Sequence, residues 1–131
     1  MIKNIILVTR PHQWIKNLII FVPLISSQKY DIFSFILCLK ALIIFSLISS
    51  CGYIINDLFD EKYDKIHPTK KNRPLASGLL DKKTCIILSI ILFCIAVLFG
   101  ISENYQFTSI LLIYILISFS YSFVLKKIII I

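Results

Sequence analysis

Charged residues are scarce in this sequence. Asp, Glu, Lys and Arg make up only 16% of its 131 residues, whereas hydrophobic residues make up 58%, and the mean hydropathy is +0.89. Soluble domains carry about 25% charged residues, so this composition excludes an ordinary soluble domain. The sequence therefore predicts an integral membrane protein.

Acidic residues are especially few, with 7 Asp and Glu against 14 Lys and Arg, which gives a formal charge of +7. A basic balance can indicate nucleic-acid binding. Here, however, runs such as 42–55 and 86–101 have no charged residue, and the cations gather between and beside these runs. Cations placed in this way are typical of membrane proteins, so the predicted partner is a membrane and not a nucleic acid.

Three further signals are missing. No two of the four cysteines form a Cys-x-x-Cys pair, so we interpret them as small buried hydrophobic residues and not as metal ligands or a disulfide. Residues 1–10 are not followed by a small-residue cleavage site, which argues against a signal peptide. Repeats and low-complexity linkers are absent as well. The sequence predicts one transmembrane domain over residues 1–131.

Apolar segments of suitable length predict the membrane spans. A spanning helix needs about 20 mainly apolar residues. The candidates are 14–28, 33–55, 84–101 and 107–125. The first is the shortest and contains Lys16, Asn17 and Pro23; we interpret it as a span, with a re-entrant or interfacial segment as the alternative. The predicted fold is all-α with about four transmembrane helices and a loop at 56–83.

The distribution of cations predicts the topology. Four spans leave twelve of the fourteen cations on one side and one on the other, which places both termini and the 56–83 loop in the cytoplasm of a multi-pass inner-membrane protein. Lys40 lies within the second span; we expect it to snorkel to the outer interface, with a polar cavity as the alternative. The sequence stops in an apolar run after Lys127, so we expect an N-terminal portion of a longer protein.

The chemically distinctive segment follows the second span directly. Its pattern is Asn-Asp-x-x-Asp-x-x-x-Asp, formed by Asn56, Asp57, Asp60 and Asp64. If the helix continues, the three aspartates lie at about 0°, 300° and 340° around its axis, on one face. Like charges on one face repel, and Mg²⁺ would neutralise them and bind a diphosphate. The alternative is a solvated acidic turn with ordinary neighbours Lys62 and Lys65.

A basic segment with two prolines comes next and favours the phosphate site. It runs from His67 to Gly78 as His-Pro-Thr-Lys-Lys-Asn-Arg-Pro-Leu-Ala-Ser-Gly. Arg73 suits bidentate contact with a phosphate, and Lys70 or Lys71 suits point-charge contact. For the two lysines, anchoring to the membrane surface is an equal alternative. Near the N-terminus, Lys16 and Asn17 are polar groups carried into a span and are further candidates.

Together these residues resemble the first aspartate-rich motif of the UbiA prenyltransferase superfamily. The blocks Arg10–Asn17 and His67–Gly78 are more similar to its decaprenyl-phosphate phosphoribosyltransferase branch, and the resemblance extends to residues 121–126. It implies a partial UbiA-like helical bundle. The implied reaction transfers 5-phosphoribosyl from Mg²⁺-bound phosphoribosyl diphosphate to a polyprenyl phosphate, a step in the synthesis of cell-envelope glycan precursors.

The resemblance also implies roles for individual residues. Asp57, Asp60 and Asp64 would be the catalytic residues that hold Mg²⁺, and apolar faces of the spans would hold the prenyl chain. The implied substrate-binding residues are Lys16, Asn17, Asn56, Lys70, Lys71 and Arg73.

One part of the family pattern is absent from the sequence. Members carry a second aspartate-rich motif, but no Asp follows Asp81 here, and Glu103 is the one later acid. Catalysis would therefore need the missing half, from a longer chain or from a second chain. Two other hypotheses stay open: an aromatic prenyltransferase that uses the same Mg²⁺-diphosphate chemistry on a 4-hydroxybenzoate-like acceptor, and a small four-span membrane protein without catalysis.

Overall fold

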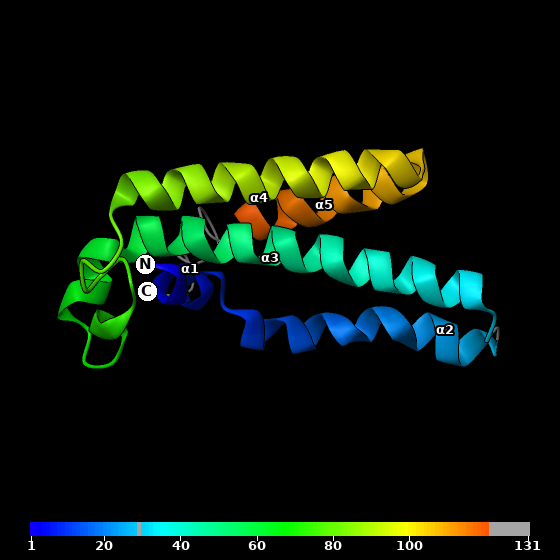
Figure 1. Ribbon diagram of the computed structural model, residues 1–131, viewed down its shortest axis with the longest axis horizontal. Coiled ribbons are helices and arrows are strands. Elements are labelled where there is room, and N and C mark those ends of the chain that lie inside the picture. The colour runs from blue at the N-terminus through cyan, green and yellow to red at the C-terminus, as the bar shows by residue number, and fades with distance from the viewer. Residues whose placement is uncertain (29, 121–131) are drawn as a thin grey trace.

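The structure, a computed structural model, describes residues 1–28 and 30–120, and every regular element in these ranges is helical. In chain order the elements are α1 (Ile2–Thr9), the 3₁₀ helix η1 (Pro11–Phe21), α2 (Val22–Ser27), α3 (Ile32–Ile66), the short 3₁₀ helix η2 (Lys70–Asn72), α4 (Lys82–Glu103) and α5 (Tyr105–Ser120). Helix α3 runs through the middle, with η1 and α2 along one side and α4 and α5 along the other (Figure 1). The all-α prediction is confirmed.

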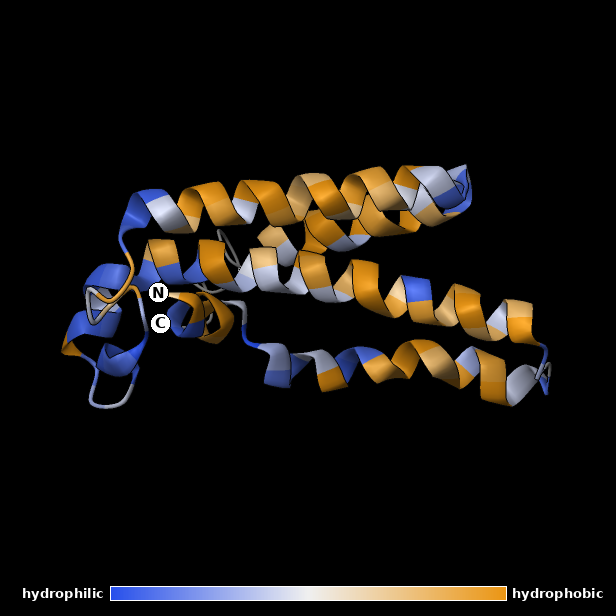
Figure 2. Cartoon of the chain, viewed as in Figure 1, coloured by the Kyte–Doolittle hydropathy of each residue, from blue (hydrophilic) through white to orange (hydrophobic). Residues whose placement is uncertain are grey.

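Helix α3 is longer than a membrane is thick. Its 35 residues extend about 52 Å, whereas the hydrocarbon core measures about 30 Å. The Asp31 carboxylate caps its start by accepting from the Ser34 N–H at 2.8 Å, and the helix ends at Ile66, with His67 as its C-cap before Pro68. Figure 2 shows an apolar middle and polar last turns beside residues 67–81. We call this end of the molecule the polar end.

Within residues 1–28 and 30–120, two helices are long and apolar enough to cross a membrane. They are α3 and α4, which contain the predicted spans 33–55 and 84–101. Helix α5 is apolar and has 16 residues. Residues 121–125 of the predicted fourth span lie outside the described residues, as do Lys29, Lys126 and Lys127 of the topology count.

The predicted first span takes an unexpected form. Where the sequence predicts one helix over 14–28, the structure has η1 followed by α2. Pro23 has no N–H to donate to the Ile19 carbonyl and would clash with it in an α-helix; instead the Val22 N–H donates to that carbonyl in 3₁₀ fashion. A 3₁₀ helix rises about 2.0 Å per residue, so η1 and α2 together extend about 31 Å, against about 25 Å for an α-helix of equal length. The 3₁₀ form therefore gives this short segment the length of a span.

Helices α3, α4 and α5 share an apolar core. Its buried residues are Ile44, Ile48, Ala96, Leu111 and Ile115. Asn104 alone separates α4 from α5, and its Oδ1 accepts from the Phe107 N–H at 2.8 Å, which starts α5. At the same end, Lys40 Nζ lies 2.8 Å from Glu103 Oε1. The sequence analysis favoured snorkelling for Lys40, and the structure gives it an ion-pair partner on α4.

The two glycines within long helices should respond oppositely to alanine. A Cβ at Gly100 would lie 2.7 Å from Leu111 Cδ2, whereas a Cβ at Gly52 meets nothing within 4 Å. Leu111 is 1% exposed and has little room to move. We expect Gly100→Ala to destabilise the protein by about 1–3 kcal/mol and Gly52→Ala to stabilise it by about 0.5–1 kcal/mol. Thermal unfolding of both variants in one detergent tests this, and shifts of the same sign would contradict the close α4–α5 contact.

Candidate functional site

Two buried carboxylates define the site at the polar end. Asp57 and Asp64 lie on the last turns of α3, and each is 2% exposed. Because they are seven residues apart, two helical turns bring them to nearly the same face. The helix does continue through the motif, which is the condition on which the predicted grouping of aspartates depended.

Two guanidinium groups converge on these carboxylates. Arg10 Nη2 lies 2.5 Å from Asp57 Oδ1, and Arg73 Nη1 lies 3.1 Å from the same oxygen and 2.6 Å from Asp64 Oδ2. Arg73 was predicted to contact phosphates, whereas sequence reasoning gave Arg10 no role. Its partner is 47 residues away in the sequence, so no local pattern could have identified the contact. The four side chains form a neutral cluster, which we call the arginine–aspartate cluster.

The third buried acid on this face is Glu61 and not Asp60. Glu61 is 7% exposed and binds Lys65 at 2.7 Å and Lys82 at 2.6 Å. Asp60 is half-buried, and its Oδ2 accepts from Asn56 Nδ2 at 3.1 Å. Around the helix axis, Glu61 lies about 40° from Asp57 and about 60° from Asp64, and Asp60 lies about 60° from Asp57 and about 40° from Asp64. The helical angle therefore does not choose between the two acids, and Glu61 is the one that meets Lys82 of α4.

The basic segment brings one of its three predicted phosphate ligands to the carboxylates. Arg73 follows η2 and reaches them, while the half-buried Lys70 and the exposed Lys71 lie within η2, outside the arginine–aspartate cluster. His67 shapes the turn, because its Nδ1 accepts from the Thr69 and Lys70 N–H groups at 3.3 Å. Both lysines are thus near the polar end but do not join the carboxylates.

The predicted pair Lys16 and Asn17 lies further along the bundle. Asn17 Nδ2 donates to Ser46 Oγ at 3.1 Å and to Ser49 Oγ at 3.4 Å. Ser46 precedes Asp57 by eleven residues, or about three turns of α3. Lys16 is exposed. The structure therefore does not bring this pair to the carboxylates, and Asn17 instead holds η1 against α3.

Other side-chain hydrogen bonds also attach η1 to its neighbours. The indole N–H of Trp14 donates to Ser50 Oγ at 2.9 Å, and Ser50 Oγ donates to the Thr9 carbonyl at 2.7 Å. Long 3₁₀ helices are uncommon because their own hydrogen bonds have poor geometry. These tertiary contacts supply the stability that the 3₁₀ helix lacks, and they fix the chain close to Arg10.

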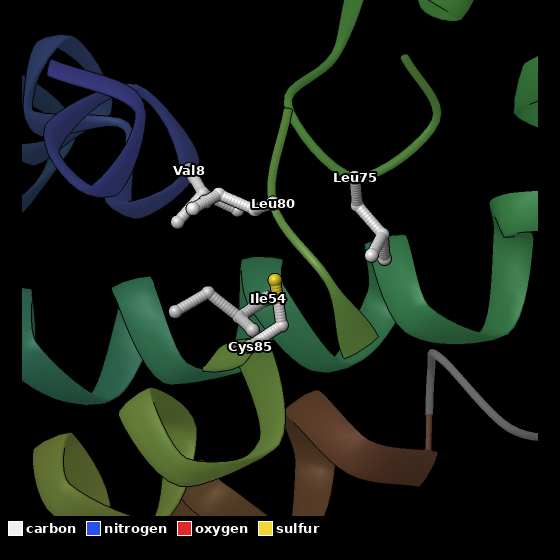
Figure 3. Packing of buried hydrophobic residues seen from close by; sticks show 5 residues of the cluster. All are labelled: Val8, Ile54, Leu75, Leu80 and Cys85. Carbon is white, nitrogen blue, oxygen red and sulfur yellow. The ribbon is translucent and has the colours of Figure 1, made fainter. Parts of the chain in front are cut away.

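An apolar cluster near the polar end joins the segments next to the arginine–aspartate cluster. Figure 3 shows its five buried members, which are Val8, Ile54, Leu75, Leu80 and Cys85. They come from α1, α3, the segment between α3 and α4, and α4. The Asp81 carboxylate caps α4 by accepting from Thr84 Oγ1 at 2.5 Å and from the Thr84 N–H at 3.1 Å, and these hydrogen bonds lower the pKa of Asp81. The apolar cluster and the Asp81 cap of α4 together fix the position of the segment that carries Arg73.

The carboxylate pair supplies part of the ligand set that Mg²⁺ requires. Mg²⁺ is usually held by one or two carboxylates together with substrate phosphates and water. Asp57 and Asp64 both contact Arg73 Nη1 and so lie close to each other. Among residues 1–28 and 30–120, no group of three or more His, Cys, Asp or Glu side chains is arranged to hold a metal ion. The pair therefore fits a site completed by phosphate oxygens.

An apolar groove lies between η1 and α3, away from the carboxylates. Its volume is about 260 Å³, and Trp14, Leu18, Leu42 and Leu47 are among its lining residues. Ser46 is the polar residue of α3 that lines it. A groove of this composition suits a hydrocarbon chain.

Comparison with known proteins identifies the family. Residues 17–131 match the profile of the UbiA prenyltransferase family. The chain belongs to this family. UbiA proteins are integral membrane transferases, which agrees with the two membrane-length helices of this chain.

Individual UbiA relatives carry different names. The chain is 27% identical over 131 residues to decaprenyl-phosphate phosphoribosyltransferase of Mycobacterium tuberculosis, covering 96% of this chain and 43% of the relative. It is 40% identical over 87 residues to digeranylgeranylglyceryl phosphate synthase of Sulfurisphaera tokodaii, covering 66% and 31%. Nodulation protein NoeC of Azorhizobium caulinodans is 38% identical over 87 residues, covering 66% and 28%. The chain thus spans less than half the length of these relatives.

Proposed function

We propose that the polar end is the half-site of a UbiA-type transferase that binds a diphosphate substrate with Mg²⁺. The observation that carries this proposal is the convergence of Arg10 and Arg73 on the buried Asp57 and Asp64. Carboxylates bind the metal ion, guanidinium groups bind phosphate oxygens, and the site needs both. An ordinary solvated turn would not bury two carboxylates at this depth.

Within the family we propose the phosphoribosyltransferase reaction. The bond between C1 of the ribose and the diphosphate oxygen breaks, a phosphate oxygen of the polyprenyl phosphate bonds to C1, and diphosphate leaves with the bonding electron pair. Mg²⁺ supplies charge neutralisation of the leaving group. Support comes from the named phosphoribosyltransferases, whose similarity extends over 96% of this chain.

Each site residue has a proposed role in this reaction. Asp57 and Asp64 hold Mg²⁺, with Asp60 and its partner Asn56 at the edge of the same face. Arg73 binds the diphosphate, and Lys70 and Lys71 attract it to the polar end. Asn17 and Lys16 belong to η1, beside the apolar groove that we assign to the prenyl chain. The second aspartate motif must come from a longer chain or from a second chain.

The predicted topology is consistent with such a site. The excess of cations on the side of residues 56–83 supports a polar end that faces the cytoplasm of the inner membrane. Phosphoribosyl diphosphate would then arrive from water, and the polyprenyl phosphate from the bilayer.

A prenyltransferase is the second candidate, favoured by the 40% identity to digeranylgeranylglyceryl phosphate synthase over 66% of the chain. Binding separates the two. With the chain in lipid nanodiscs and Mg²⁺ present, we expect phosphoribosyl diphosphate to bind more tightly than geranylgeranyl diphosphate, and EDTA to abolish binding. The opposite order would favour the prenyltransferase. If neither diphosphate bound in an EDTA-sensitive manner, the proposal that the polar end binds a diphosphate with Mg²⁺ would fail, and a non-catalytic membrane protein would be favoured.

A further inference from the structure

Arg10 is the site residue that neither the motif nor the comparisons assign. It follows α1, which packs against α3 near the polar end (Figure 1). Its guanidinium contacts Asp57 at 2.5 Å and lies over the Tyr53 ring, 5.1 Å from the centroid. Its side chain is 19% exposed. It is therefore held in place while part of its side chain stays exposed.

Position 10 has an arginine, although lysine is the commoner cation in this sequence. The sequence contains 14 cationic residues, of which only Arg10 and Arg73 are arginines, and both contact the same oxygen of Asp57. Arginine differs from lysine in its planar fork of donors, which matches two phosphate oxygens at once. One guanidinium group for each carboxylate is enough for charge neutrality, yet both guanidinium groups contact a single oxygen of Asp57. Two guanidinium groups on one oxygen supply more donors than the carboxylates use.

The backbone at Arg10 is also unusual. Its φ of 50° and ψ of 58° place it in the left-handed region, which costs a residue with a Cβ about 1 kcal/mol or more. Only Arg10 and Gln28 among the described non-glycine residues have positive φ. This conformation turns the chain from α1 into η1, where Pro11 follows at once. Strain of this kind persists when surrounding contacts fix it, and it is concentrated at functional sites.

From these contacts we infer that Arg10 is a diphosphate-binding residue that uses Asp57 as a temporary partner. Without ligand, Arg10 and Arg73 neutralise Asp57 and Asp64. When the carboxylates bind the divalent ion, the two guanidinium groups turn to phosphate oxygens, while the Tyr53 ring continues to hold the Arg10 guanidinium. This inference rests on the proposed function, because it requires a diphosphate and a divalent ion in the same site.

The exchange of partners predicts effects of opposite sign on two ligands. In Arg10→Gln, Mg²⁺ competes with one guanidinium group for Asp57 instead of two, because Arg73 remains, so MgCl₂ alone should bind more tightly. Inorganic pyrophosphate with Mg²⁺ loses a charge-assisted contact and should bind about tenfold or more weakly. A residue that only stabilised the fold would weaken both. Arg10→Lys keeps the charge without the fork, and we expect an intermediate loss of pyrophosphate affinity.

Trp14 provides the readout, because it is the only tryptophan in the sequence and lies four residues from Arg10. The full chain in lipid nanodiscs is titrated with MgCl₂ alone and then with pyrophosphate in MgCl₂, and Trp14 fluorescence is followed. Lys3→Gln is the matched control, since Lys3 is an exposed cation of α1, and both affinities should stay unchanged. Thermal unfolding of each variant establishes that it is folded.

Three outcomes are distinguishable. Opposite shifts in Arg10→Gln, with Lys3→Gln unchanged, support the inference. The second outcome is that the wild-type chain binds pyrophosphate with Mg²⁺, while Arg10→Gln binds both ligands as the wild type does or binds both more weakly. Arg10 is then not a diphosphate ligand, and the proposed function stands. If the wild-type chain shows no Mg²⁺-dependent binding of pyrophosphate, the proposed function and this inference are both overturned.

Discussion

Asp57→Asn is expected to weaken Mg²⁺-dependent binding of pyrophosphate by about a hundredfold or more. Asp57 is 2% exposed and accepts from both arginines. Changes in residues that merely support metal ligands cost about 10–100-fold in affinity, so loss of a carboxylate that itself holds the ion should cost at least as much. The asparagine amide cannot neutralise either guanidinium group, and one carboxylate, Asp64, would remain for two arginines.

This charge imbalance gives the variant a second property. Because its cluster is net positive, the Asp57→Asn variant should lose less affinity for pyrophosphate in EDTA than in Mg²⁺, each relative to the wild type. The ratio of its affinity in Mg²⁺ to its affinity in EDTA should therefore fall toward one. Asp31→Asn is the matched control: Asp31 caps α3 at the opposite end, and asparagine is also a good N-cap. Equal Mg²⁺ dependence in Asp57→Asn and in the wild type would contradict the assignment of Asp57 as a metal ligand.

The aspartate face was predictable because it depends on local geometry. A helix of 100° per residue places Asp57 and Asp64 together whatever the rest of the chain does, and the long uncharged runs that became α3 and α4 likewise carry their own signal. The same calculation does not distinguish Glu61 from Asp60, because each lies about 50° from the midpoint between Asp57 and Asp64. Glu61 was missed because its burial depends on Lys82 of α4, which is distant in the sequence.

Contacts between distant segments were not predictable in this way. Arg10 meets Asp57 across 47 residues of sequence, and Lys40 meets Glu103 across 63. Neither pair has a periodic signature in the sequence, so the neighbours of each residue along the chain do not reveal its partner. The 3₁₀ form of η1 depends similarly on Trp14 and Asn17 bonding to serines of α3. Pro23 is the residue of this segment whose presence indicates that a continuous α-helix is disfavoured.

The apolar cluster links these distant segments, and Ile54 is the largest of its fully buried side chains. Ile54 is 0% exposed and packs with Val8 of α1, with Leu75 and Leu80, and with Cys85 of α4 (Figure 3). Arg10 directly follows α1, Arg73 lies two residues before Leu75, and both contact Asp57. We therefore expect the packing around Ile54 to determine whether both guanidinium groups can contact the carboxylates at the same time.

Ile54→Ala is expected to lower the free energy of unfolding by about 2–5 kcal/mol, because it removes buried methyl groups and leaves a cavity that three segments border. The same loss of packing should weaken pyrophosphate binding in Mg²⁺, although the Ile54 side chain is apolar. Ile43→Ala is the matched control on the same helix, since Ile43 is 54% exposed and its truncation should change stability by less than about 1 kcal/mol. Thermal unfolding and Trp14 fluorescence titration of both variants measure the two effects. If Ile54→Ala lost stability but bound pyrophosphate as the wild type does, the arginines would be positioned by their own ion pairs and not by the apolar cluster.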